Sequence, residues 1–100
     1  MIQHIKMLYA KNLDILEKKS QDYSSGDNPF RNFMAVEQLG ICTTEQGMLS
    51  RMADKYLRII NLLEKGPDVK EESMEDTISD FINYLALFSA YRQYKKERNG

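Results

Sequence analysis

The sequence predicts an all-α fold, a bundle of three long helices and one short helix. Apolar residues recur at the spacing of one helix face in three long segments, and no segment of useful length alternates with period two. The 100 residues suffice for one compact domain, so residues 1–100 are expected to fold as a unit. Because so thin a bundle leaves apolar surface uncovered, we expect copies of the chain to associate, at least as a dimer, and complete it.

Turn and cap residues predict where the first two helices begin and end. The first helix is expected over residues 2–22, because Ser, Gly, Asp, Asn and Pro accumulate in the segment YSSGDNP that follows it. Asn28 is the expected N-cap of a short helix with Pro29 in its first position. That helix is expected to stop at Gly40.

Two long helices are expected after this turn. Residues 43–46 read Thr-x-x-Gln, a capping box in which each side chain accepts a backbone N–H of the other residue. The helix that the box opens should run to Lys65, because a Gly-Pro pair follows. The last helix should begin within residues 71–73 and continue past Tyr91, and its cationic end suits a helix C-terminus.

Charge and cysteine content exclude several classes of function. The net charge of −1 gives no general attraction to nucleic acid or to anionic membranes, so no direct nucleic-acid partner is expected. Cys42 is the single cysteine, which excludes an internal disulfide and a cysteine-cluster zinc site. The N-terminal segment is charged throughout and no apolar run approaches the ~20 residues of a membrane span. We therefore expect a cytoplasmic protein with no membrane partner.

Three carboxylates of the last helix share one face. Glu72, Asp76 and Asp80 follow one another at intervals of four residues, and Asn83 falls about 20° from Asp76 on the same stripe. Neighbouring carboxylates repel one another, and a divalent cation such as Mg²⁺ or Mn²⁺ would offset that repulsion. The alternative is a solvated acidic face near a helix N-terminus, where negative charge is favourable in any case.

A cationic row lies on the middle helix. Arg51, Lys55 and Arg58 fall within about 60° of one another, on the side away from the apolar residues of that helix. Such a row can hold phosphates, because arginine donates a bidentate fork and lysine supplies a point charge. The alternative is that the basic row and the acidic stripe of the neighbouring helix pair with each other.

A third polar patch surrounds the turn after the first helix. Lys19, Asp22 and Tyr23 precede this turn, and Phe30 and Phe33 follow it. Aromatic faces beside polar turn residues can stack on a nucleotide base and hydrogen-bond it. The alternative is that the two phenylalanines, at positions i and i+3, belong to the hydrophobic core.

Three segments taken together resemble a known family. KKSQDYSSGDNPFRNF, GMLSRMADKYLRIINLL and ESMEDTISDFINYLAL resemble the nucleotide-modification-associated domain family of phage and bacterial proteins. That pattern includes a Lys-x-x-Asp-Tyr segment, a lysine and an arginine on the middle helix, and a final helix with D...D..NY. The family in turn looks like an outlying branch of the MazG-like all-α nucleoside triphosphate pyrophosphohydrolases. The resemblance covers residues 15–90, with the motifs in the same order.

The resemblance implies a nucleotide site in the cytoplasm of a bacterial or phage-infected cell. The positions that match the motifs are Lys19, Asp22, Tyr23, Arg51, Asp54, Lys55, Arg58, Glu72, Asp76, Asp80, Asn83 and Tyr84. In the pyrophosphohydrolases, a Glu-x-x-Glu pair and a Glu-x-x-Asp pair on successive helices hold Mg²⁺. Here Glu72 and Glu75 form one such pair on the last helix, and no later helix supplies the second.

Two functions from different classes follow from these residues. In the first, the protein hydrolyses a nucleoside triphosphate to monophosphate and pyrophosphate. Glu72, Asp76 and Asp80 would hold Mg²⁺ or Mn²⁺, Asp80 would also be catalytic, and Asp22 would complete the metal site or orient water. The cationic row would neutralise the developing charge.

In the second, the protein sequesters a nucleotide or a cyclic-nucleotide signal without turnover. Such a protein needs phosphate donors and base-stacking aromatic residues, but no activated water. A helical interaction module without a small ligand is a third possibility.

Overall fold

The computed structural model describes residues 1–23, 28, 30–66 and 71–99, although not the side chains of residues 21–23, 71 and 72. Its helices are α1 (Ile2–Tyr23), α2 (Arg31–Gln38), α3 (Thr44–Lys65) and α4 (Glu71–Asn99). The residues in these ranges form no strand, and the predicted all-α fold is confirmed. None of the described helices has both the length and the apolar character needed to cross a membrane.

The ends of α3 are those that its sequence predicts. The Gln46 backbone N–H donates to Thr43 Oγ1 at 3.0 Å, and the Thr43 backbone N–H donates to Gln46 Oε1 at 3.0 Å. The reciprocal pair satisfies two of the backbone donors that a helix start leaves open. At the other end, Gly66 caps the helix with a φ of 60°, a conformation that glycine adopts without strain.

The predicted N-cap of the short helix is wrong. α2 begins at Arg31 with Phe30 in the N-cap position, and no side chain caps it. The Asn28 side-chain oxygen instead accepts a hydrogen bond of 2.9 Å from the backbone N–H of Phe30. A bond from an asparagine side chain to the backbone two residues on is typical of a turn, and the predicted position of Pro29 lies outside the described residues.

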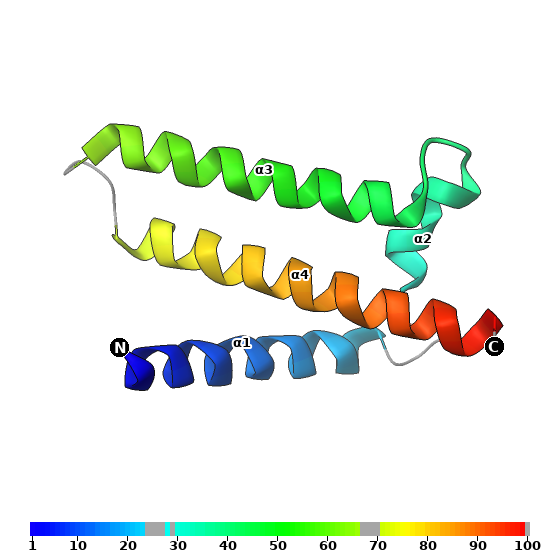
Figure 1. Cartoon of the computed structure of the whole chain (residues 1–100), viewed down its shortest axis with the longest axis horizontal. Helices are drawn as coiled ribbons and strands as arrows, with labels where there is room; N and C mark the ends of the chain where they lie inside the picture. Colours follow the sequence, from blue (N-terminus) through cyan, green and yellow to red (C-terminus); the bar gives the residue numbers. More distant parts are fainter. Residues whose placement is uncertain (24–27, 29, 67–70, 100) are drawn as a thin grey trace.

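The three long helices lie roughly in one layer, with α4 in the middle (Figure 1). α3 runs antiparallel to α4 along one side, and α1 runs parallel to α4 along the other. α2 packs against the N-terminal part of α3. Gly47 permits that close approach, because a Cβ at this position would lie 2.9 Å from Val36 Cγ2.

The hydrophobic core lies where α2 meets α3 and the C-terminal half of α4. Its buried members are Phe30, Met48, Met52 and Tyr91. The rings of Phe30 and Tyr91 meet edge to face at a centroid distance of 5.4 Å, an arrangement that aromatic pairs favour. Phe30 is only 7% exposed, so the alternative that places this residue in the core is confirmed.

α3 turns its cationic side, rather than its most apolar side, toward α4. Met48, Met52 and Leu62 are buried on the packed side. Lys55 and Arg58 contact Asp80 and Thr77 of α4 beside them. The apolar residues of the other side are exposed, namely Leu49, Ala53, Tyr56, Leu57 and Leu63.

Candidate functional site

A cavity of about 350 Å³ lies among all four helices, and six of the predicted site residues line it. Its volume falls in the range of small-molecule sites, about 300 to 1,000 Å³. α1 contributes Lys19, α3 contributes Arg51, and the start of α2 contributes two aromatic rings. The full lining is Leu16, Lys19, Ser20, Phe30, Phe33, Arg51, Asp80, Asn83, Tyr84, Ala86, Leu87 and Ala90. Each of the three predicted polar patches therefore contributes to the lining of one cavity. The turn contributes Phe30 and Phe33, the cationic row Arg51, and the stripe of the last helix Asp80 and Asn83.

Phe33 organises the aromatic side of this cavity. The Arg51 guanidinium carbon lies 5.2 Å from the centroid of the Phe33 ring, within the range of a cation–π contact. The Tyr84 ring meets Phe33 edge-on, with centroids 6.4 Å apart and planes at 85°. Both contacts restrict side chains that would otherwise sample several rotamers. The charge of Arg51 is thereby held over the face of the Phe33 ring.

Asn83 supplies a buried polar group to the cavity wall. Its side chain is 8% exposed, and its carboxamide oxygen has no hydrogen-bond partner among the described residues. Burying a polar group without a partner costs about 1–3 kcal/mol, so a buried carboxamide in a cavity wall is a natural contact for a ligand or for bound water. Asn83 is therefore the wall residue best suited to hydrogen-bond an occupant.

The acidic stripe is paired with lysines. Lys55 Nζ lies 3.3 Å from Asp80 Oδ2. Lys11 Nζ lies 4.0 Å from Asp76 Oδ1, between side chains that are 52% and 66% exposed. Lys55 and Asp80 thus pair as the alternative interpretation predicts, in which the basic and acidic rows of neighbouring helices contact each other. Lys11 of α1 is a partner that the helix spacing did not suggest.

The described residues do not form a metal centre. No group of three or more His, Cys, Asp or Glu side chains converges among them. Asp80 is the one carboxylate among the residues that line the cavity, and Lys55 already neutralises it. These donors do not fit a hard divalent cation, which takes several oxygen ligands. The side chain of Glu72 lies outside the described residues, and the Mg²⁺ or Mn²⁺ site stays a prediction.

Three further predicted residues whose side chains the structure describes do not line the cavity, namely Lys55, Arg58 and Asp76. Lys55 reaches it only through its pair with Asp80. Arg58 is one turn farther along α3, where its Nε donates to Thr77 Oγ1 at 3.2 Å. Asp76 faces Lys11. The side chains of Asp22 and Tyr23 fall outside the described residues, so their predicted roles stay predictions.

Small residues outside the predicted set of site residues make room for the cavity. Ala86 and Ala90 lie one turn apart on α4, and Ser20 lies opposite on α1. Larger side chains at these positions would fill the space between the two helices. The sequence indicates this space through a pair of alanines at i and i+4, because residues at that spacing lie on one surface of a helix.

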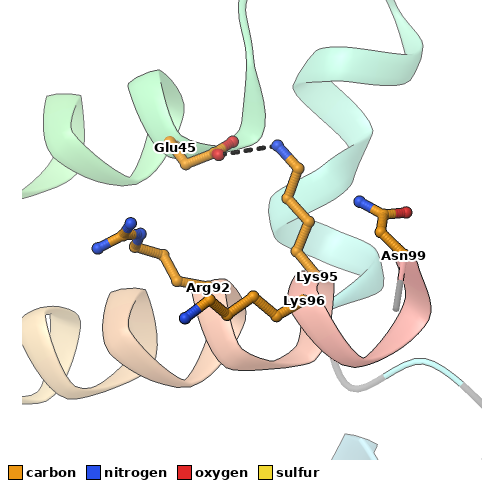
Figure 2. A pocket seen from close by; sticks show the side chains of 5 residues that line it. All are labelled: Glu45, Arg92, Lys95, Lys96 and Asn99. Carbon is orange, nitrogen blue, oxygen red and sulfur yellow. Dashed lines mark hydrogen bonds and ion pairs between the residues drawn. The ribbon is translucent and has the colours of Figure 1, made fainter.

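A second cavity, of about 380 Å³, lies at the C-terminal end of α4. Figure 2 shows Lys95 reaching across to Glu45 of α3, and their charged atoms are 3.1 Å apart. The pKa of Glu45 is lowered, first by a backbone hydrogen bond at the start of α3 and then by the hydrogen bond from Lys95. The pKa of Lys95 is raised by the same carboxylate. Arg92, Lys96 and Asn99 complete the lining.

This second cavity is the weaker candidate. Cations at the C-terminal end of a helix are stabilised by the helix dipole without any ligand. The strongest contact there, between Glu45 and Lys95, joins α3 to α4 and so has a structural role. None of the predicted site residues lines it. The four-helix cavity is therefore the candidate functional site.

Comparison with protein-family models, with curated proteins and with solved structures finds no match for this chain.

Proposed function

We propose that the protein binds a nucleotide, or a phosphorylated molecule derived from one, in the four-helix cavity. The observation that carries the proposal is the convergence of two cations, two aromatic rings and one buried carboxamide on a single cavity. They are contributed by Lys19 and Arg51, by Phe33 and Tyr84, and by Asn83. A nucleotide presents these chemistries together, because it joins an anionic phosphate to a flat base with hydrogen-bonding edges.

Each group has a role that its chemistry supports. Arg51 and Lys19 would hold phosphate oxygens, the arginine through two parallel N–H groups and the lysine as a point charge. A base could stack on an aromatic face, which contributes about 1–3 kcal/mol in single-stranded nucleic-acid complexes. Asn83 would hydrogen-bond the base or the sugar. Binding without turnover needs no further group.

Sequestration agrees better with the observed carboxylates than hydrolysis does. A metal ion at Asp80 would have to displace the Lys55 ammonium, which lies 3.3 Å away. Asp76 lies outside the cavity lining, beside Lys11. We therefore place a sequestering protein first. Hydrolysis to monophosphate and pyrophosphate is the second candidate, and the observation in its favour is that Asp80 lines the same cavity as the cations.

The test is binding to a panel of nucleoside triphosphates and cyclic nucleotides, measured calorimetrically with Mg²⁺ or with a chelator. After heat denaturation, the released ligand is identified by mass spectrometry. Sequestration predicts that at least one ligand is recovered intact and that its affinity is insensitive to the chelator. Pyrophosphate release that Asp80→Asn abolishes would instead establish hydrolysis.

Arg51 and Arg58 provide a matched pair of variants. Both are exposed arginines of α3, but only Arg51 lines the cavity. Hydrogen bonds to charged groups contribute about 1.5–3 kcal/mol, so Arg51→Met should weaken binding roughly 10- to 100-fold. Arg58→Met removes the same charge outside the cavity and should change affinity less than about threefold. Equal losses in the two variants would refute the proposed site.

A further inference from the structure

α3 carries a run of apolar residues at the spacing of a coiled coil. Successive members of the run are separated by four, three, four and three residues, which is the alternation of d and a positions in a heptad. We call this run the α3 seam. It consists of Leu49, Ala53, Tyr56, Ile60 and Leu63.

Most of the α3 seam is left open to solvent by the described part of the chain, although Ile60 is half-buried. Leu49 is 49% exposed, Tyr56 is 56% exposed and Leu63 is 65% exposed. α3 packs through a different side, on which Met48 is 1% exposed and Met52 is 5% exposed. Apolar area contributes about 25 cal/mol per Å² when it is removed from water, so an open seam is a large unused source of binding energy.

The chain exposes more surface than a folded monomer of its mass is expected to expose. The chain exposes 7598 Å², whereas a folded monomer of 11.7 kDa is expected to expose about 5,900 Å². The excess of about 1,700 Å² is roughly twice the ~800 Å² that each partner buries in a standard interface. The radius of gyration, 15.6 Å, likewise exceeds the value of about 13 Å expected for 100 residues.

We infer that the α3 seam binds the α3 seam of a second copy, with the two helices antiparallel and a two-fold axis at Tyr56. The ends of the seam are symmetric about this residue, because Leu49 and Leu63 lie seven positions to either side of it, whereas Ala53 lies three positions before it and Ile60 four after it. Each Leu49 then meets the Leu63 of the other copy. Antiparallel pairing also sets the positive dipole end of each helix beside the negative end of its mate.

A two-fold contact at Tyr56 suits the chemistry of tyrosine. Its ring supplies a large apolar surface to the centre of the seam, while its hydroxyl can remain at the wet edge. Leu57, which is 55% exposed next to the seam, extends the apolar contact. The four-helix cavity remains free, because Arg51 lies on a different side of α3. The inference is therefore independent of the proposed ligand.

The first experiment is sedimentation velocity across a range of protein concentrations. Wild type should be a dimer or larger at micromolar concentration, and Tyr56→Glu should raise the dissociation constant at least 100-fold by placing two carboxylates on the axis. Ile41→Glu is the control, because Ile41 is 70% exposed but lies in the turn before α3. Its dissociation constant should change less than about threefold. Circular dichroism would establish that both variants are helical.

The second experiment fixes the direction of the helices by cysteine cross-linking in a Cys42→Ser background. Tyr56→Cys should cross-link to itself, since side chains on a two-fold axis can reach the Cβ separation of about 4 Å that a disulfide needs. Leu49→Cys should cross-link to Leu63→Cys, but not to itself. A monomeric wild type, an equal loss of association in Ile41→Glu, or efficient coupling of Leu49→Cys to itself would overturn the inference.

Discussion

The ion pair between Lys55 and Asp80 bears on whether the acidic stripe consists of ion-pair partners or of metal ligands. If Asp80 serves mainly as the partner of Lys55, removing either charge should destabilise the fold, and removing both should cost less than the sum of the single changes. We therefore predict a favourable coupling energy in a double-mutant cycle of Lys55→Met and Asp80→Asn. Both substitutions keep approximately the shape of the side chain.

The magnitude of the coupling follows from the distance and the exposure. Two unit charges 3.3 Å apart attract by about 1 kcal/mol in water and about 5 kcal/mol at an effective dielectric constant of 20. The Lys55 side chain is 28% exposed and that of Asp80 is 51% exposed, so solvent screens the pair. Exposed pairs contribute about 0.2–1 kcal/mol in measured cycles, and we expect about 0.5–1 kcal/mol because the lysine is half-buried.

The assay is urea unfolding of wild type, the two single variants and the double variant, followed by circular dichroism. All four are measured at one protein concentration, because association would add a concentration dependence to the apparent stability. The cycle is repeated at 1 M NaCl, where the Debye length falls to about 3 Å. The coupling should be clearly smaller there than at 0.1 M.

Two results would refute this reasoning. A coupling of zero at 0.1 M salt would mean that the pair has no energetic role. A stabilisation by Mg²⁺ that is present in wild type and absent in Asp80→Asn would mean that this carboxylate binds metal in preference to Lys55.

Two further predictions concern the contacts of α3 with its neighbours. Gly47→Ala should lower the free energy of unfolding by up to about 2 kcal/mol, because overpacking against Val36 costs about 1–3 kcal/mol and outweighs the ~1 kcal/mol gain in helix propensity. Thermal denaturation measures this change, with Ser50→Ala at an exposed position of the same helix as the control. A Gly47→Ala variant more stable than wild type would contradict the prediction. The lowered pKa of Glu45 stabilises the fold above the ordinary pKa of glutamate, about 4.3, and this contribution is lost as the pH falls through the folded-state value. The stability difference between wild type and Glu45→Gln, measured by urea unfolding, should therefore shrink as the pH falls from 7 to 3. A stability difference that stays constant with pH would exclude the ionised Glu45 carboxylate as the cause of that difference.

The helix ends illustrate how far local sequence reaches. Thr43 and Gln46 form their capping box because both partners lie within one turn, so no other part of the chain has to be known. Asn28 shows the limit of the same reasoning. Its side chain can accept a backbone N–H either at the start of a helix or within a turn. Which of the two occurs depends on the conformation of the backbone that follows. The burial of Phe30 in the core accompanies the turn.

The cavity was partly predictable. Arg51 was expected at the site because arginine suits phosphate recognition, and Lys19 and Asn83 because they match motifs of the family that the sequence resembles; all three line one cavity. Arg58 and Asp76 satisfy the same spacing rules and still lie elsewhere. Arg51 is the first residue of the cationic row and Asp80 is the last of the acidic stripe, so each row reaches the cavity with one end only.

The sequence by itself determined the helices, the caps of α3 and the two sides of α3. Both sides have helical periodicity, one with methionines and cations and the other with leucines and tyrosine. Tertiary structure alone decided that the first side packs on α4 and leaves Tyr56 exposed. The physical reason is that periodicity records which residues share a face, whereas the choice of neighbour depends on what another helix offers. α4 offers Asp80 and Tyr91, which match a cation and a methionine better than a leucine seam.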